Sequence, residues 1–151
     1  MKNQNSTIEE DIKFMRLALQ QAELAAERDE VPIGAIIVSE GRVIARAHNL
    51  TETLTDVSAH AEMQAITSAA NYLNGKYLVG CTLYVTVEPC LMCAGALGWS
   101  QISRIVYGAP DPKRGYHTYC DNPFHKKTTI TTGILEDECS QIITNFFRHK
   151  R

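Results

Sequence analysis

The feature that most constrains the fold is a pair of short motifs about thirty residues apart, His60-Ala61-Glu62 and Pro89-Cys90-Leu91-Met92-Cys93. Two cysteines separated by two residues can direct both sulfurs to a single metal ion, and a helix that begins at the first of them favours thiolates through its free N–H groups. His60 offers a third ligand from an earlier segment. Three protein ligands with a fourth position left for water are typical of catalytic zinc sites. The fold therefore has to bring the two motifs together.

Glu62 lies two residues after His60 and is not needed as a metal ligand. From this position it can reach the open coordination site, which suits a carrier of protons. Three other interpretations of the cysteine pair stay open: a redox pair, half of a structural zinc site, and two unrelated core thiols. The further ligands available to a structural site are Cys81, Cys120, His117 and His125. The upstream His-x-Glu favours a catalytic site that binds one Zn²⁺ per subunit, with Glu62 as the catalytic residue.

The rest of the chain alternates between helical and strand patterns. Helices are expected over residues 6–28, 59–73, 89–100 and 135–149, the first of them opened by a capping box at Ser6-Thr7-Ile8-Glu9. Strands are expected over residues 35–38, 43–47, 82–87, 104–108 and 128–132. The turn at Glu40-Gly41 makes a hairpin of the first two strands, and the intervening helix makes the third and fourth parallel. The pattern predicts one three-layer α/β/α domain over residues 1–151 with a central mixed five-stranded sheet.

Helical spacing also predicts which side chains face the core. Met63 and Ile66 are expected to face the core from the second helix, and Ile142, Ile143 and Phe146 from the last. The metal site is expected where two helices begin beside strand ends, the usual place for a site in an α/β sheet.

Charge is unevenly distributed along the chain. The net charge of −2 is not typical of a nucleic-acid-binding protein, but residues 101–151 carry 8 basic and 5 acidic side chains, against 7 and 12 in residues 1–100. The basic end, Arg148-His149-Lys150-Arg151, is suited to phosphate binding. The alternative is a solvated helix end whose cations complement the helix dipole.

Composition indicates the compartment. Five cysteines are an odd number, of which two are assigned to the metal, and this pattern is typical of a reducing environment. The first ten residues are polar and acidic, and no apolar run approaches the length of a membrane span. A cytoplasmic protein without membrane contact and without an organic cofactor is expected.

The two motifs resemble the signature of the zinc-dependent nucleobase deaminases. The resemblance covers nearly the whole chain, and its other matching segments are Val31-Pro32-Ile33-Gly34-Ala35, Asn49, Thr82-Leu83-Tyr84-Val85-Thr86, Glu88, Cys93-Ala94-Gly95-Ala96 and Phe146-Phe147-Arg148. The chain is most like bacterial tRNA-specific adenosine deaminases. The resemblance implies a cytidine-deaminase-like fold, hydrolytic deamination of adenosine to inosine at the wobble position of a tRNA anticodon loop, and a homodimer.

The resemblance also implies three substrate-binding residues. Asn49 matches a residue that hydrogen-bonds the target base, Asp111 matches one beside the ribose, and Arg148 belongs to the RNA-facing terminal helix. Each has a plainer alternative: Asn49 and Asp111 are common turn residues, and Arg148 suits a helix end.

The segment from Arg114 to Phe124 matches the family less well, because it is shorter than in many relatives and carries Tyr116, His117, Tyr119 and Cys120. These aromatic side chains could stack on RNA bases, pack at the edge of the core, or close a smaller pocket over a free base. A deaminase of a free base, nucleoside or nucleotide, such as cytosine, guanine, cytidine or dCMP, is therefore the second hypothesis. A third is a zinc-stabilised RNA-binding module without turnover, although such a module has no use for Glu62.

Overall fold

The computed structural model describes residues 4–150, with side chains from Thr7 onward, so that Arg151 lies outside the described residues. The elements in chain order are α1 (Gln4–Glu27), β1 (Gly34–Ser39), β2 (Arg42–His48), α2 (Ala61–Leu73), β3 (Cys81–Val87), α3 (Leu91–Ser100), β4 (Arg104–Ala109), a short 3-10 helix η1 (Tyr116–Thr118), β5 (Thr129–Thr132) and α4 (Glu136–His149). All the expected helices and strands are present, with ends shifted by a few residues.

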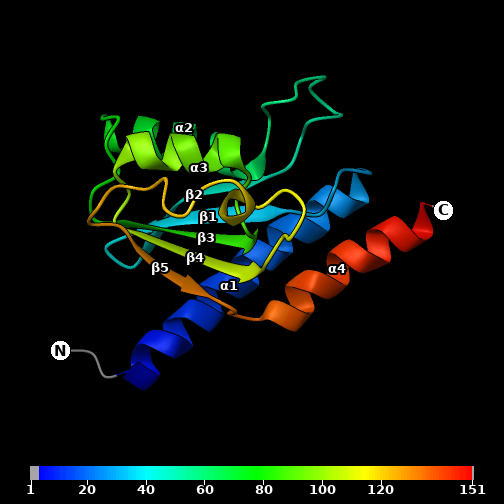
Figure 1. The fold of residues 1–151 in the computed structure, drawn as a ribbon, viewed down its shortest axis with the longest axis horizontal. Helices are drawn as coiled ribbons and strands as arrows, with labels where there is room; N and C mark the ends of the chain where they lie inside the picture. The colour runs from blue at the N-terminus through cyan, green and yellow to red at the C-terminus, as the bar shows by residue number, and fades with distance from the viewer. Residues whose placement is uncertain (1–3, 151) are drawn as a thin grey trace.

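The five strands form one mixed sheet in the order β2-β1-β3-β4-β5. β1 is antiparallel to both β2 and β3, whereas β3, β4 and β5 run parallel. Helices α2 and α3 cover one face of the sheet, and α1 and α4 cover the other (Figure 1). The predicted three-layer α/β/α architecture with a central mixed five-stranded sheet is confirmed.

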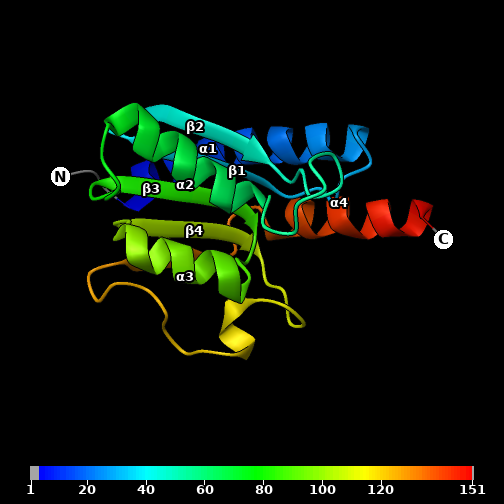
Figure 2. The ribbon, with the colours of Figure 1, turned by 90° about the horizontal axis from the view of Figure 1, so that it is seen from above.

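Strand direction brings four connections to one edge of the sheet. β1 begins at this edge and β2 ends there, because Gly34 pairs with His48. β3 and β4 end there too, since Val87 pairs with Ala109 (Figure 2). The segment before β1 and the segments after β2, β3 and β4 therefore meet at one edge, which is where ligand sites form in α/β sheets.

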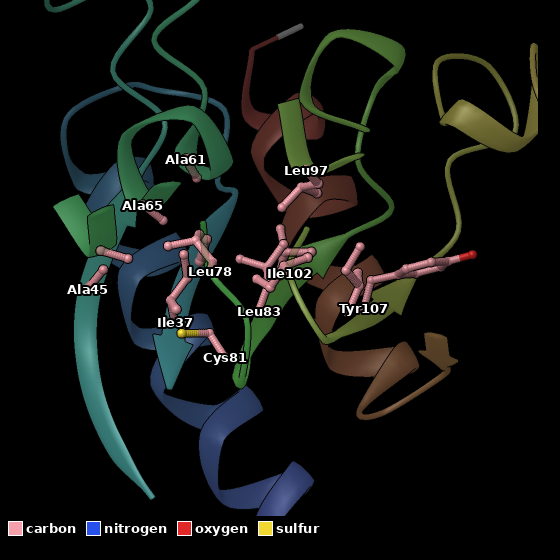
Figure 3. Close-up of a cluster of buried hydrophobic side chains, with 14 of the residues drawn as sticks. Ile37, Ala45, Ala61, Ala65, Leu78, Cys81, Leu83, Leu97, Ile102 and Tyr107 are labelled. Carbon is pink, nitrogen blue, oxygen red and sulfur yellow. The ribbon is translucent and has the colours of Figure 1, made fainter. Parts of the chain in front are cut away.

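The three central strands, β1, β3 and β4, are buried on both faces, so their successive residues enter two different cores. One core lies under α2 and α3 and contains Ile37, Leu83 and Ile105 (Figure 3). The other lies against α1 and contains Ile36 and Tyr84. This two-sided burial explains why the strands read as nearly continuous apolar and β-branched runs.

The first residue of β1 touches α1 directly. A Cβ atom on Gly34 would overlap the carbonyl oxygen of Ala18 and would lie 2.5 Å from the amide nitrogen of Ala22. The amide of Gly34 donates a hydrogen bond to Thr86 Oγ1 at 3.2 Å. Glycine is required here because helix backbone and strand backbone come into contact.

The start of α1 differs from the prediction. The helix is already formed at Gln4, so Ser6 lies inside it rather than at its N-cap. The predicted end of α2 is confirmed, since Asn74 caps the helix in the left-handed conformation with a φ of 57°.

The core-facing side of α2 agrees with the prediction only in part. Ile66 is half-buried and packs against the core, as expected. The buried residues of this helix are Ala61, Glu62, Ala65 and Ala69, and Met63 is only half-buried. Alanines at intervals of four residues let the helix axis approach the sheet closely, and the longer side chains are then displaced to its flanks.

The last helix is also less buried than predicted. Ile142, Ile143 and Phe146 are half-buried, and Cys139 in the first turn is the buried residue of α4. Its sulfur lies against Gly108 of β4. The rest of α4 runs past the end of the sheet beside α1 (Figure 1), so the sheet cannot cover its apolar side chains. Among residues 4–150, none of the helices is long and apolar enough to cross a bilayer.

Candidate functional site

The three expected metal ligands lie together at the edge of the sheet where β1 begins and where β2, β3 and β4 end. His60 is the N-cap residue of α2, and Cys90, three residues beyond β3, is the N-cap residue of α3. His60 Nδ1 lies 3.5 Å from Cys90 Sγ and 3.5 Å from Cys93 Sγ. All three donor atoms are within 4.8 Å of one another. Nitrogen and sulfur ligands at about 2.0 and 2.3 Å from a tetrahedral zinc ion are themselves about 3.5 Å apart. Both distances from His60 Nδ1 to a cysteine sulfur match this spacing.

The two thiols have very different proton affinities. Hydrogen bonds from Cys93 and His60 lower the pKa of Cys90 to about 4, although burial opposes the shift. The hydrogen bond to Cys90 and burial raise the pKa of Cys93. The hydrogen bond to Cys90 also raises the pKa of His60. A thiolate is therefore favoured at Cys90, where the start of α3 adds its own positive potential.

Glu62 lies in the first turn of α2 with only 3% of its surface exposed. Burial raises the pKa of its carboxyl group to about 7, while a hydrogen bond with Cys93 opposes the shift. The carboxyl group is thus beside the donor cluster and titrates near neutrality, which are the two properties required of a general acid and base.

Asn49 is buried directly after β2. The backbone amide of Asn49 donates to the carbonyl of Ile33 at 3.1 Å. Its side-chain oxygen accepts a weak hydrogen bond from the backbone amide of Thr51 at 3.4 Å. The end of β2 is joined to α2 by Gln64, whose side-chain amide donates to the carbonyls of His48 at 2.8 Å and Ala59 at 3.0 Å. Gln64 therefore links His48, the residue before Asn49, to Ala59, the residue before His60, a role that the sequence did not suggest.

Asp111 follows β4 and organises a turn. Its Oδ1 accepts hydrogen bonds from the amides of Lys113 at 3.1 Å and Arg114 at 3.0 Å. The interpretation of Asp111 as a turn residue is confirmed. The turn uses only Oδ1, and the other carboxylate oxygen, Oδ2, takes no part in it.

The loop after Asp111 is held against the metal-binding segment by Glu88. This buried carboxylate accepts hydrogen bonds from the amides of Asp111 at 3.1 Å and His117 at 3.0 Å. The amide of Tyr116 donates to the carbonyl of Pro89 at 2.9 Å. Gly115 lies so close to the Glu88 carboxylate that there is no space for a Cβ atom. Glu88 stands beside the cysteine motif in the sequence, but nothing in the pattern indicated that it binds a distant loop.

Of the three roles expected for the aromatic segment, packing at the edge of the core is confirmed for Tyr116. Tyr116 is buried and packs its ring edge-on against Phe124, with ring centroids 4.8 Å apart, so it belongs to the edge of the core. Tyr119 is exposed.

A groove of about 690 Å³ lies between α4 and the segments around β1 and β4. Its lining includes Asp111 and also Lys113, Arg114, Phe147 and Lys150. Arg148 is exposed on α4 and is not among the lining residues. Lys150, which also pairs with Asp29 at 2.6 Å, is the basic residue at the end of α4 that lines the groove.

Comparison with known proteins identifies the family. The sequence model of the MafB19-like deaminase family matches residues 9–151. The tRNA-specific adenosine deaminase of Agrobacterium fabrum is 47% identical over 91% of this chain and 94% of its own length. That of Bacillus subtilis is 44% identical over 94% of this chain and 91% of its own.

Solved structures agree with this assignment. A structure from a study of A-to-I editing by tRNA:A34 deaminases at the wobble position superposes with a TM-score of 0.81 at 46% identity, covering 86% of this chain and 98% of the other. Guanine deaminase from Bacillus subtilis superposes less well, with a TM-score of 0.62 at 33% identity over 72% of this chain and 66% of its own. With its three metal-ligand candidates and a buried glutamate in place, the chain belongs to the tRNA-specific adenosine deaminases, a family of hydrolytic deaminases.

Proposed function

We propose that residues 1–151 form one zinc-dependent deaminase domain that converts adenosine to inosine at the wobble position of tRNA. The observation that carries the proposal is the cluster of His60, Cys90 and Cys93 with Glu62 buried beside it. High identity to tRNA-specific adenosine deaminases over nearly the whole chain supports tRNA as the substrate.

In the proposed reaction His60 Nδ1 and the sulfurs of Cys90 and Cys93 would hold one Zn²⁺. When bound, zinc would supply a Lewis acid that makes water nucleophilic near neutral pH. The Glu62 carboxylate accepts one proton of the attacking water and donates it to the ring nitrogen of the adenine. It then moves the second proton of that water to the leaving amine. Water and adenosine thus give inosine and ammonia. A backbone N–H at the start of α3 is proposed to stabilise the attacking oxygen.

Substrate recognition is assigned to the loops around the site. The Asn49 side chain is proposed to bind the target base, and Asp111 to lie beside its ribose. An adenosine in an anticodon loop is unpaired, so it can enter the site at a modest cost in lost stacking. The groove beside Asp111 offers Lys113, Arg114 and Lys150 to phosphates and Phe147 to a neighbouring base.

We also propose that the enzyme is a cytoplasmic homodimer. Leu91, Met92 and Trp99 of α3 are exposed, and Trp99 shows 86% of its surface, whereas Leu97 is buried. A row of exposed apolar side chains on the metal-binding helix is suited to an interface between subunits. Light scattering at micromolar concentration is expected to give twice the chain mass of 16.8 kDa. A species of 16.8 kDa alone would contradict the dimer.

The decisive experiment measures ammonia release and inosine formation by the zinc-loaded protein. The substrates are an arginine-type anticodon stem-loop and, separately, free cytosine, guanine, cytidine and adenosine. Inosine at the first anticodon position is expected. Turnover of guanine without turnover of the stem-loop would instead support the second candidate, a free-base deaminase, which the 33% identity to a guanine deaminase favours.

Reversal of charge on α4 tests the RNA contact. Arg148→Glu is expected to raise KM for the stem-loop about tenfold and to leave kcat within twofold, because it replaces an attraction for phosphate by a repulsion. The matched control is Arg42→Glu, which makes the same charge change at an exposed position at the start of β2. Equal effects of the two substitutions would show that net charge alone, and no contact with α4, governs the affinity.

A further inference from the structure

The loop of residues 50–59 joins the base-binding candidate Asn49 to the metal-ligand candidate His60. Its two ends are paired, since the amide of Leu50 donates to the carbonyl of Ala59 at 3.0 Å. Within it, the amide of Asp56 donates to the carbonyl of Thr51 at 3.0 Å. The loop projects away from the sheet above the end of α1 (Figure 1). Residues 52–57 are exposed, and Val57 is 88% exposed. A compact loop with so few contacts to the rest of the protein needs an anchor at its base to keep one conformation.

That anchor is the carboxylate of Glu30, which is fully buried. Glu30 Oε1 accepts a hydrogen bond from the amide of Glu52 at 3.1 Å. Glu30 Oε2 accepts two from Thr53, one from the amide at 2.7 Å and one from the hydroxyl at 2.6 Å. Burial raises the pKa of Glu30, but the hydrogen bonds from Thr53 and Glu52 outweigh this effect and lower the pKa below its ordinary value. The group is therefore an ionised carboxylate whose charge is balanced by donors of the loop.

The segment that carries Glu30 is itself fixed. The backbone amide of Glu30 donates to the carbonyl of Ala25 at 2.9 Å, and this hydrogen bond fixes the segment to the end of α1. Three residues later, the carbonyl of Ile33 accepts the hydrogen bond from the amide of Asn49. The chain from Asn49 to Thr53 is thus held at both ends by one short segment. Between these ends the amide of Thr51 binds the side-chain oxygen of Asn49, so the anchored turn orients that side chain.

The other end of the loop has a separate attachment. Gln64 holds the carbonyl of Ala59 and, at 3.4 Å, also that of His60. Loss of the hydrogen bonds of Glu30 should therefore loosen the Asn49 side of the loop and leave His60 in place.

We infer that Glu30 is a positioning residue for the deamination: its buried carboxylate holds residues 50–59 so that Asn49 is oriented toward the target base. This inference rests on the proposed function, in which Asn49 binds the base. Glu30 contacts no reacting atom and acts only through the loop.

The first test compares Glu30→Gln with Glu52→Gln in the zinc-loaded protein. In Glu30→Gln an amide group replaces one acceptor, so hydrogen exchange at the amides of Glu52 and Thr53 is expected to accelerate at least tenfold. KM for the anticodon stem-loop is expected to rise about tenfold, kcat to fall less than threefold, and zinc content to stay at one per chain. Glu52→Gln removes the same charge from an exposed side chain and is expected to change neither exchange nor KM by more than twofold.

Thr53 supplies a second pair of variants, in which Glu30 itself is unchanged. Thr53→Val removes the hydroxyl donor and is expected to raise KM threefold or more, whereas Thr53→Ser retains the donor and is expected to restore the wild-type value. The inference is overturned if Thr53→Val and Thr53→Ser have the same KM. It is also overturned if Glu30→Gln loses zinc, or if Glu30→Gln lowers kcat and leaves KM unchanged.

Failure of this inference is distinguishable from failure of the proposed function. If the wild-type protein does not deaminate the stem-loop, the proposed function is wrong, and the assignment of Glu30 to that reaction falls with it. If the wild type is active and the Glu30 and Thr53 variants keep its exchange rates and KM, the positioning role alone is wrong.

Discussion

The Glu62→Ala variant is expected to deaminate the anticodon stem-loop at least about a thousandfold more slowly than the wild type while keeping its zinc. A positioned general acid and base contributes about 10²- to 10⁴-fold to a reaction rate, and here one carboxyl group serves several proton transfers in turn. Glu62 is buried, so bulk water cannot readily replace it. Inosine formation gives kcat, and metal analysis of the same sample gives zinc per chain.

Glu62→Gln is the matched control for packing, because glutamine fills the same volume and cannot carry the proton. Both variants are expected to lose activity to a similar extent and to unfold at similar temperatures. Full turnover in either would contradict the role of Glu62. Loss of zinc from both would show that Glu62 is a ligand of the metal and not a proton carrier.

The largest effect on stability is expected from Gly34→Ala. The added Cβ would overlap the carbonyl oxygen of Ala18 and would approach the amide of Ala22 to 2.5 Å, so α1 must move away from the sheet. Both neighbours are backbone atoms that cannot move to a new rotamer. Overpacking of this kind costs about 3 kcal/mol or more, which corresponds to a fall in Tm of roughly 10 °C for a chain of this length. Thermal unfolding of the zinc-loaded protein measures it.

Gly75→Ala is the control for this prediction. A Cβ atom on Gly75 would have no other atom within 4 Å, so the same chemical change is expected to leave Tm within 2 °C. Because Gly34 opens β1 immediately after Ile33, the Gly34 variant is also expected to weaken stem-loop binding. An unchanged Tm in Gly34→Ala would mean that α1 can withdraw from β1 without cost.

The sequence predicted the order and type of the elements because their signals are local. Apolar and β-branched runs between turns marked the five strands, and the helix between residues 82 and 108 implied the parallel pair of β3 and β4. Asn74 marked the end of α2 through its tolerance of a left-handed conformation. The predictions of buried side chains were weaker: periodicity indicates which positions share a helix face, but not which face approaches the sheet, and at α2 the alanines rather than Met63 do so.

In the candidate site, too, some residues were predicted from the sequence, and the roles of others became clear only from the structure. His60, Glu62, Cys90 and Cys93 were predicted from residue types at characteristic spacing, because metal ligation and proton transfer require those groups whatever surrounds them, and they lie together in the structure. The sequence by itself determined this set and the α/β class. Only the tertiary structure decided that Glu30 and Glu88 hold loops, that Gly34 must lack a side chain, and that Lys150 rather than Arg148 lines the groove. The physical reason is that these roles depend on contacts between segments distant in the chain, and no local spacing records which backbone amide or helix a side chain will meet.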